Sequence, residues 1–296
     1  MPTYVVTYIC NNNCVSCISN RAVLKQKKEP SIEEIKRWVD KIEKNADHIG
    51  ITGGEPTLRK DLFEILSYIR ERHPQHYIFL VTNGRMFCYE RYVQKLANLN
   101  LNRNETPYFD LFRIGVALYS HIPEIHDLIT RVPGSWDQTV QGIKNLTKYN
   151  LKVELRIIVN KFNYKILPET AKFIVNEFHN LDRIVFINMA ILGNAFINKD
   201  KIAIKYSDAV PHVEKAVDIL IKNKMNVKTF HFPLCIIKRK YWKIAKGITK
   251  EESDLTFVKQ CKECVYKNDC ARIWKSYPYI MGTSEFHAIK KFRGHV

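Results

Sequence analysis

Three cysteines within eight residues constrain this sequence more than any other feature. They form Cys10-Asn-Asn-Asn-Cys14-Val-Ser-Cys17, directly after the apolar run Thr3–Ile9. Thiols at this spacing can converge on one small object from a single loop. A closed structural zinc site uses four ligands, whereas a cubane iron–sulfur cluster bound by three thiolates leaves one iron open. The alternative interpretations are a zinc knuckle that lacks one ligand and three unrelated cysteines.

A second motif, Gly53-Gly54-Glu55-Pro56, follows the next apolar stretch of the chain. A CxxxCxxC loop after a first strand and a GGEP segment after a second resemble the radical S-adenosylmethionine (SAM) enzymes. The resemblance implies that Cys10, Cys14 and Cys17 hold a 4Fe–4S cluster whose open iron binds SAM. It also implies that Gly53, Gly54 and Glu55 lie along the methionine part of SAM, with the carboxylate receiving its ammonium group.

Polar residues also follow or interrupt the later apolar runs. By resemblance, Asn83 is a candidate for the SAM ribose and Ser120 for the SAM carboxylate, although Asn-Gly at 83–84 is also an ordinary turn pair. Arg156 shares one face of an expected strand with Glu154. An arginine that faces the inside of a barrel is costly unless it meets an anion. That anion is the SAM carboxylate or, in a purely structural role, Glu154.

Six strand-and-helix alternations extend from Thr3–Ile9 to Ile184–Met189. Short connections between them predict an α/β fold, a partial (β/α)6 TIM-like barrel. Ligands of such sheets gather at the carboxyl ends of the strands, where the candidate residues fall. Ser31 and Glu34 predict a capping box at one helix start, and 100–107 is expected to be a loop. We expect the barrel to span residues 1–205 and a small cysteine-rich extension to span 206–296.

Four further cysteines lie in that extension: Cys235, Cys261, Cys264 and Cys270. Their spacing fits either a four-cysteine zinc site or a second 4Fe–4S cluster. Many radical SAM enzymes carry an auxiliary cluster in a C-terminal SPASM domain or its shortened twitch form. The resemblance therefore implies a second 4Fe–4S cluster here, with zinc less favoured. Cys88 stands apart and is expected to be a plain buried thiol.

Several segments resemble the maturases of His-Xaa-Ser peptide systems: Phe232–Cys235, Tyr241–Ala245, the CxxC-x5-C ending formed by Cys261, Cys264 and Cys270, Tyr119–Asp127 and Val153–Arg156. Two departures qualify the wider resemblance. The family usually has a large apolar or aromatic residue before its third cysteine, where this chain has Ser16, so adenine contacts must come from elsewhere, such as Ile18. The residues after Cys270 are not the glycine-rich continuation that the family leads us to expect.

The implied activity is radical SAM chemistry. An electron from the cluster cleaves SAM and gives a 5′-deoxyadenosyl radical, which removes hydrogen from the substrate. We expect oxidative modification, such as cross-linking, of a ribosomally made peptide. Alternatives are dehydrogenation of a small molecule and modification of RNA. A non-enzymatic alternative is a zinc-stabilised nucleic-acid-binding protein that uses both sets of cysteines.

The charge of the chain favours an anionic partner. Lys and Arg number 47 against 30 Asp and Glu, which gives a net charge of +17. This suits an electron donor such as flavodoxin or ferredoxin. The basic residues are dispersed, so nucleic acid is the less favoured partner. The sequence shows neither an export signal nor a long apolar run, so we expect a cytoplasmic protein without a membrane partner.

Overall fold

A seven-stranded parallel sheet organises the chain. The computed structural model describes residues 3–44, 46, 48–102, 111–249 and 252–290. Every strand of the sheet pairs with the strands before and after it in the sequence, and each pair is parallel. The strands are β1 (Thr3–Thr7), β2 (His48–Gly53), β3 (Tyr77–Thr82), β4 (Phe112–Ala117), β5 (Val153–Val159), β6 (Arg183–Asn188) and β7 (Val227–Phe230). This order is that of an open barrel with β1 and β7 at its edges, which confirms the expected α/β class.

The sequence predicted six strands in this sheet, and the structure has seven. β7 pairs with β6 from Ile184↔Val227 to Ile187↔Phe230 and so belongs to the main sheet. It has only four residues, and it runs into the segment before Cys235 that was expected to belong to the extension. The division of the chain at residue 205 stays a prediction, and the sheet continues beyond that position.

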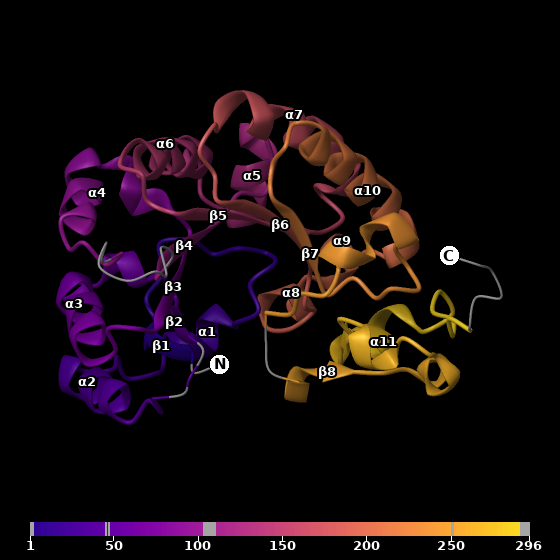
Figure 1. Ribbon diagram of the computed structural model, residues 1–296, viewed down its shortest axis with the longest axis horizontal. Coiled ribbons are helices and arrows are strands. Elements are labelled where there is room, and N and C mark those ends of the chain that lie inside the picture. The colour runs from indigo at the N-terminus through magenta and orange to yellow at the C-terminus, as the bar shows by residue number, and fades with distance from the viewer. Residues whose placement is uncertain (1–2, 45, 47, 103–110, 250–251, 291–296) are drawn as a thin grey trace.

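Helices cover the outer face of this curved sheet. Figure 1 shows α2, α3, α4, α6, α7 and α10 along the outside of the arc that the strands form. The α-helices are α1 (Arg21–Leu24), α2 (Ile32–Asp40), α3 (Leu62–Arg72), α4 (Glu90–Ala97), α5 (Pro123–Thr130), α6 (Ser135–Lys148), α7 (Leu167–Glu177), α8 (Asn194–Ile197), α9 (Lys199–Ile202), α10 (Tyr206–Lys222) and α11 (Ser276–Met281). Ser31 and Glu34 form the predicted capping box at the start of α2. Of the loop expected at 100–107, residues 103–107 lie outside the described part of the chain.

Strand β5 shows how the sheet separates an apolar face from a polar one. Val153, Leu155, Ile157 and Val159 are fully buried. Because strand side chains alternate between faces, Glu154 and Arg156 point to the other, concave face. Arg156 pairs in register with Val185 of β6, and Val185 pairs with Lys228 of β7, so both cations belong to one row on this face. The concave face therefore carries charge into the interior of the open barrel.

Two glycines allow the chain after β1 to lie against the end of β2. A Cβ atom on Gly53 would lie 2.3 Å from the carbonyl oxygen of Thr7, and one on Gly54 would lie 2.2 Å from that of Ile9. The backbone of Gly54 donates to Thr7 O and that of Glu55 to Ile9 O, both at 2.7 Å. From the sequence, these glycines were linked to a ligand. The structure shows that the chain's own backbone already requires them.

The remaining part of the chain packs at the carboxyl ends of β6 and β7. It contains the two-stranded antiparallel pair β8 (Leu255–Thr256) and β9 (Ile273–Trp274). Trp274 Nε1 donates to the carbonyl oxygen of Asn188, at the end of β6, at 2.9 Å, and its ring lies 4.0 Å from that of His231. Among the described helices, none has the length and apolar content to cross a membrane.

We predict that Gly54→Ala destabilises the fold by about 1–3 kcal/mol, because the added methyl group meets backbone atoms that cannot turn away. The same change should displace the chain after β1 and reduce iron binding at Cys10–Cys17. Thermal unfolding and iron content measure the two effects. Gly134→Ala is the matched control, since Gly134 has a φ of +75° but no atom within 4 Å of an added Cβ. Gly134→Ala should cost stability through backbone strain and keep its iron; normal iron binding by Gly54→Ala would contradict this account.

Candidate active site

The three N-terminal cysteines lie on a loop, residues 10–17, that side chains from distant parts of the chain hold in place. We call it the cysteine loop. Arg21 Nη2 donates to Cys10 O at 2.8 Å, and Arg85 Nη1 donates to Asn11 O at 2.7 Å. From α8, Asn194 Nδ2 donates to Cys14 O at 3.2 Å. Arg21 follows the loop itself, Arg85 follows β3 and Asn194 follows β6. Three separate parts of the chain thus fix the backbone of the cysteine loop.

Each thiol of the cysteine loop accepts a hydrogen bond. The backbone N–H of Asn12 donates to Cys10 Sγ and that of Ser19 to Cys17 Sγ, both at 3.4 Å, while the hydroxyl of Tyr119 donates to Cys14. Such donors stabilise a thiolate, the form that binds iron.

Burial acts in the opposite direction on these thiols. It raises the pKa of Cys10 to about 11 and that of Cys14 to about 12. Without metal the two thiols are therefore protonated at neutral pH, and metal binding must displace their protons. Among the described residues, no three His, Cys, Asp or Glu side chains meet closely enough to hold a single metal ion. A multi-atom cluster is larger than one ion and takes ligands that are farther apart.

Glu55 is a buried carboxylate that receives four hydrogen bonds. Thr57 donates to it from its backbone N–H at 3.0 Å and from its hydroxyl at 2.6 Å. Thr82 Oγ1 donates at 2.6 Å and the backbone of Asn83 at 2.7 Å. All four donors are neutral, and no Lys or Arg within the described ranges forms an ion pair with Glu55. Burial raises the pKa of Glu55. A carboxylate in this position fits a cationic ligand.

Asn83 connects Glu55 to the cysteine loop. Its backbone N–H bonds to Glu55, and its side-chain Nδ2 donates to Asn11 Oδ1 at 2.7 Å. The carbonyl oxygen of Asn83 accepts from Thr139 Oγ1 at 3.1 Å. The structure therefore brings together three of the predicted elements: the cysteine loop, the Gly53–Glu55 segment and Asn83.

The other two predicted residues lie elsewhere in the bonding network. Ser120 is fully buried, and its hydroxyl oxygen accepts from the backbone of Ile122 at 2.8 Å. Arg156 Nε lies 3.6 Å from Glu154 Oε1, and its guanidinium group lies 5.4 Å from the ring centroid of Phe79. Arg156 thus lies beside Glu154, which the sequence left open as its structural partner. Neither residue makes a described hydrogen bond to the cysteine loop or to Glu55, so their roles in SAM binding stay predictions.

The adjacent pair His126 and Asp127 is structural. Asp127 accepts hydrogen bonds from Gly134 N, Ser135 Oγ and Trp136 N, between 2.6 and 2.9 Å, at the start of α6. His126 Nδ1 accepts from the backbone of Tyr119 at 3.3 Å. These contacts fix the loop after β4.

Sequence reasoning missed Arg21, Arg85, Asn194 and Tyr119. The first three act through hydrogen bonds to backbone, which for Arg85 and Asn194 is far away in the sequence, and no local pattern marks such contacts. Tyr119 had a signal. Its hydroxyl bonds to Ser16 as well as to Cys14, and Ser16 was the unusual small residue before the third cysteine. Tyr119, only 8% exposed, therefore lies beside the position where the family resemblance led us to expect an apolar or aromatic side chain.

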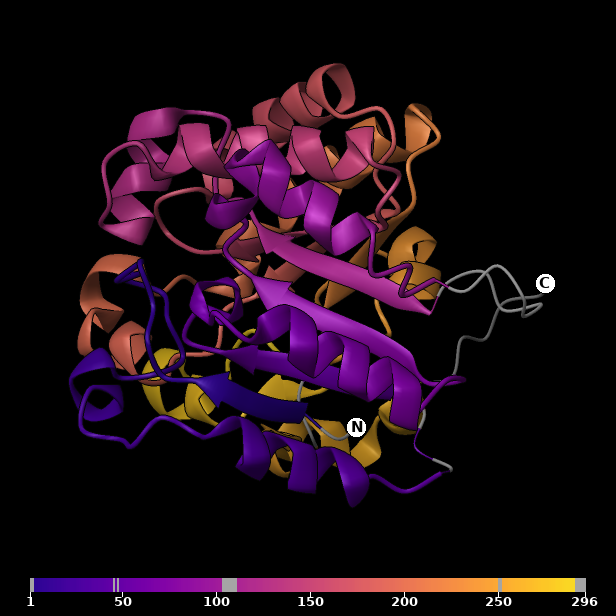
Figure 2. The ribbon, with the colours of Figure 1, turned by 90° about the vertical axis from the view of Figure 1, so that its left-hand side faces the viewer.

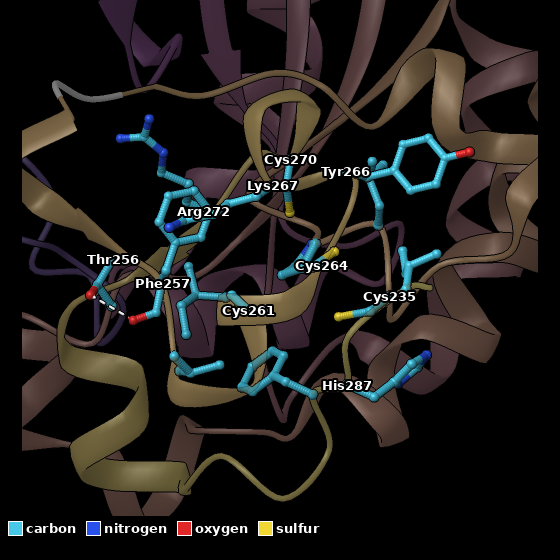
Figure 3. Close-up of a pocket in the computed structure, with 16 residues that line it drawn as sticks. Cys235, Thr256, Phe257, Cys261, Cys264, Tyr266, Lys267, Cys270, Arg272 and His287 are labelled. Carbon is cyan, nitrogen blue, oxygen red and sulfur yellow. Dashed lines mark hydrogen bonds between the residues drawn. The ribbon is translucent and has the colours of Figure 1, made fainter. Parts of the chain in front are cut away.

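The four cysteines of the extension line one pocket. Cys235, Cys261, Cys264 and Cys270 surround it together with Phe257 and Ile289. Figure 3 shows the sulfur atoms of Cys235 and Cys270 turned toward the same central space. Burial raises the pKa of Cys235 to about 11.

Two cations also line this pocket. Lys267 Nζ and the guanidinium carbon of Arg272 each lie 4.9 Å from the ring centroid of Phe257. An iron–sulfur cluster with four thiolate ligands is an anion, so this combination of four thiols and two cations fits it.

Comparison with known proteins identifies the family. The sequence profile of the radical SAM superfamily matches residues 4–174. The chain belongs to the radical SAM superfamily. It is therefore an enzyme that uses a 4Fe–4S cluster and SAM, and this excludes the non-enzymatic zinc protein. The cysteine loop and the cation-free carboxylate of Glu55 fit the cluster and the SAM ammonium group.

Curated radical SAM relatives differ in their substrates. Fe-coproporphyrin III synthase of Methanosarcina barkeri is 29% identical over 231 residues, 77% of this chain and 52% of the relative. A probable GTP 3′,8-cyclase of Saccharolobus islandicus is 29% identical over 76% of this chain and 67% of the relative. The mycofactocin maturase MftC of Mycobacterium tuberculosis is 29% identical over 57% of this chain and 40% of the relative. The chain thus spans between two fifths and two thirds of these relatives' own lengths.

Solved structures of peptide-modifying enzymes share the fold. Streptococcus suis SuiB bound to the precursor peptide SuiA has a TM-score of 0.58 and 17% identity, over 77% of this chain and 47% of SuiB. The enzyme anSMEcpe with bound AdoMet and the Kp18Cys peptide has a TM-score of 0.59 and 19% identity, over 77% of this chain and 63% of that protein. At these identities the similarity establishes the radical SAM fold.

We predict that Glu55→Gln weakens SAM binding about 10- to 100-fold, because an ionic hydrogen bond to the ammonium group is lost. In the wild type, SAM affinity should fall as the pH decreases through the raised pKa of Glu55, since only the ionised form attracts a cation. The SAM-free fold should respond in the opposite sense and gain stability as Glu55 is protonated. Calorimetric titration from pH 8 to pH 5.5 tests this. A pH dependence that persists in Glu55→Gln would assign it to another group.

Tyr119→Phe should lower the reduction potential of the first cluster, because a hydrogen bond to a ligand sulfur stabilises the reduced, more negative form. A redox titration followed by electron paramagnetic resonance measures the shift. Tyr92→Phe is the control, since Tyr92 donates to Thr57 O at 2.9 Å instead of to a thiol. Equal potentials in Tyr119→Phe and the wild type would show that Tyr119 does not influence the cluster.

Proposed function

We propose that this radical SAM enzyme oxidatively modifies a ribosomally made peptide. The observation that carries the proposal is the position of the two cysteine sets. The cysteine loop follows β1, and the four-cysteine pocket belongs to the segment that packs at the ends of β6 and β7. Both sets therefore lie at the carboxyl edge of the sheet, toward opposite ends of the strand order. A substrate on the concave face would lie between them.

This arrangement suits an oxidation. Bound at the cysteine loop, the cluster and SAM supply a 5′-deoxyadenosyl radical that removes one hydrogen atom from a substrate carbon. Completing the oxidation requires the substrate to lose one more electron and a proton. We propose that Cys235, Cys261, Cys264 and Cys270 hold a second 4Fe–4S cluster that accepts this electron. Four thiolate ligands leave that cluster no open iron for a substrate, which favours electron transfer over substrate binding.

A peptide is the favoured substrate class. The solved proteins of similar fold include SuiB bound to its precursor peptide and anSMEcpe bound to a peptide, and MftC is named a maturase. The resemblance to the maturases of His-Xaa-Ser peptides agrees with these, and it stays a prediction.

A small anionic molecule is the second candidate substrate. Fe-coproporphyrin III synthase and GTP 3′,8-cyclase align with more of this chain than MftC does. The concave face also presents Lys228, to which no acidic side chain of the described part of the chain is paired. A carboxylate or phosphate group would complement this cation.

Direct assays separate these substrate classes. Reconstituted enzyme with SAM and dithionite is incubated with a His-Xaa-Ser repeat peptide, coproporphyrin or GTP. We predict that the peptide raises 5′-deoxyadenosine formation above the uncoupled rate and loses two hydrogens in its mass spectrum. Stimulation by coproporphyrin or GTP, and none by the peptide, would instead support the small-molecule function.

Cys264→Ala tests the second cluster. It should reduce the iron content from about eight to about four per chain and stop product formation, while SAM cleavage without substrate continues. Cys88→Ala is the control, because Cys88 belongs to neither cysteine set. A full iron content or full turnover in Cys264→Ala would show that the extension does not hold an essential cluster.

A further inference from the structure

An exposed apolar surface lies beside the cysteine loop, and apart from Ile18, a candidate for the adenine contact, its residues have no role in the proposed chemistry. Five large apolar side chains form it: Ile18 is 47% exposed, Leu128 53%, Leu192 42%, Phe196 51% and Ile197 63%. We call these five residues the apolar patch. A group of exposed apolar side chains of this kind marks an interaction surface.

Backbone and side-chain contacts connect the three segments of the apolar patch. A Cβ on Gly193 would lie 2.4 Å from the carbonyl oxygen of Ile18, and Asn194 N donates to Ser19 O at 3.3 Å. On the other side, Arg131 Nη2 donates to Asn198 Oδ1 at 2.7 Å. The segment around α8 therefore contacts both the chain that follows the cysteine loop and the end of α5. Figure 2 shows α8 and the indigo chain after β1 at the same edge of the molecule.

The apolar patch has a strongly basic border. Segments 18–28, 128–133 and 192–205 together contain eight Lys or Arg residues and one acidic residue, Asp200. Lys199 Nζ lies over the Phe196 ring, 5.3 Å from its centroid. Lys201 is exposed and belongs to the same short helix, α9. A second copy of this chain would bring like charges together here, so the border favours an acidic partner.

The apolar patch is also directly attached to the cysteine loop. The backbone N–H of Ala195 donates to Cys17 O at 3.1 Å, and Asn194 Nδ2 donates to Cys14 O at 3.2 Å. These two residues stand between Leu192 and Phe196 in the sequence. A protein docked on the apolar patch would thus be separated from the ligand loop of the first cluster by one short helix.

We propose that the apolar patch and its basic border are the docking surface for an acidic one-electron donor protein. The inference rests on the radical SAM chemistry above, in which the first cluster must gain one electron for each SAM cleaved. The donor loses that electron and the cluster at Cys10, Cys14 and Cys17 gains it. Encounters of this type use small interfaces, and opposite charges accelerate them at low ionic strength.

Two reductants separate docking from chemistry. The assay measures 5′-deoxyadenosine formation by the holoenzyme, with either dithionite or a flavodoxin kept reduced by NADPH and its reductase. Ile197→Ser and Lys201→Glu should each lower the flavodoxin-supported rate at least fivefold, through a higher KM for flavodoxin, and leave the dithionite-supported rate unchanged. The wild-type rate with flavodoxin should fall with added salt, and Lys201→Glu should reduce this dependence.

Ile221→Ser and Lys222→Glu are the matched controls. Both residues are exposed and lie at the end of α10 that leads into β7, at the opposite edge of the sheet from the cysteine loop. Three results would overturn the proposal. The control variants could lose as much of the flavodoxin-supported rate as the patch variants, the patch variants could lose activity equally with both reductants, or the patch variants could lose none. A wild-type dimer that Ile197→Ser converts to monomer would overturn it in favour of self-association. Absence of wild-type activity with dithionite would instead refute the radical SAM chemistry itself.

Discussion

The buried carboxylate of Glu55 is the interaction on which the site depends. It joins the end of β2 to the end of β3 through Thr57, Thr82 and Asn83. Asn83 continues the connection to Asn11 in the cysteine loop. The hydrogen-bond donors to Glu55 compensate for the hydration that its carboxylate loses on burial. They leave the negative charge without a counter-ion, which is unfavourable in a dry interior. In the proposed site the ammonium group of SAM would supply that counter-ion, so the residues that shape the site would be stabilised by the molecule that they bind.

The local features of the fold could be predicted from the sequence. The strands alternate or run fully apolar, and Ser31 with Glu34 gave the start of α2 correctly. β7 was missed because four residues carry too little periodicity to be separated from the cysteine-rich segment that comes after them. The face of Arg156 was predicted, but the sequence left open whether its partner is Glu154 or the SAM carboxylate, and the structure places it beside Glu154. Side-chain partners across a barrel depend on register and curvature, which local patterns do not encode.

The same limit applies to the candidate site. The cysteines, Glu55 and Asn83 could be expected to lie together because they follow strands whose carboxyl ends must meet at one edge. Arg21, Arg85 and Asn194 position the cysteine loop through its backbone, so their chemistry has no signature at the level of residue type. The sequence singled out Gly53 and Gly54 as residues that lie along a ligand, whereas the structure shows close contacts with the chain's own backbone. Their lack of side chains first serves the contact between β2 and the chain after β1.

In the proposed function, the curved sheet provides the edge at which the radical forms, and the extension would accept the electron that the substrate radical loses. The relatives named above differ in their substrates although their sequences align with this one, so the shared fold alone does not select a substrate. In this chain the pocket of four thiols lies at the opposite end of the strand order from the first cluster site. Two redox sites at one edge of a sheet suit removal of a hydrogen atom and then an electron from one substrate.

The central claim is that Cys10, Cys14 and Cys17 hold a cluster that cleaves SAM reductively. Anaerobic reconstitution of the wild-type protein, with iron and sulfide counted and SAM plus dithionite added, tests it most directly. The account predicts about eight irons per chain, from two 4Fe–4S clusters, and formation of 5′-deoxyadenosine. A protein that binds zinc but no iron, and leaves SAM intact, would contradict it.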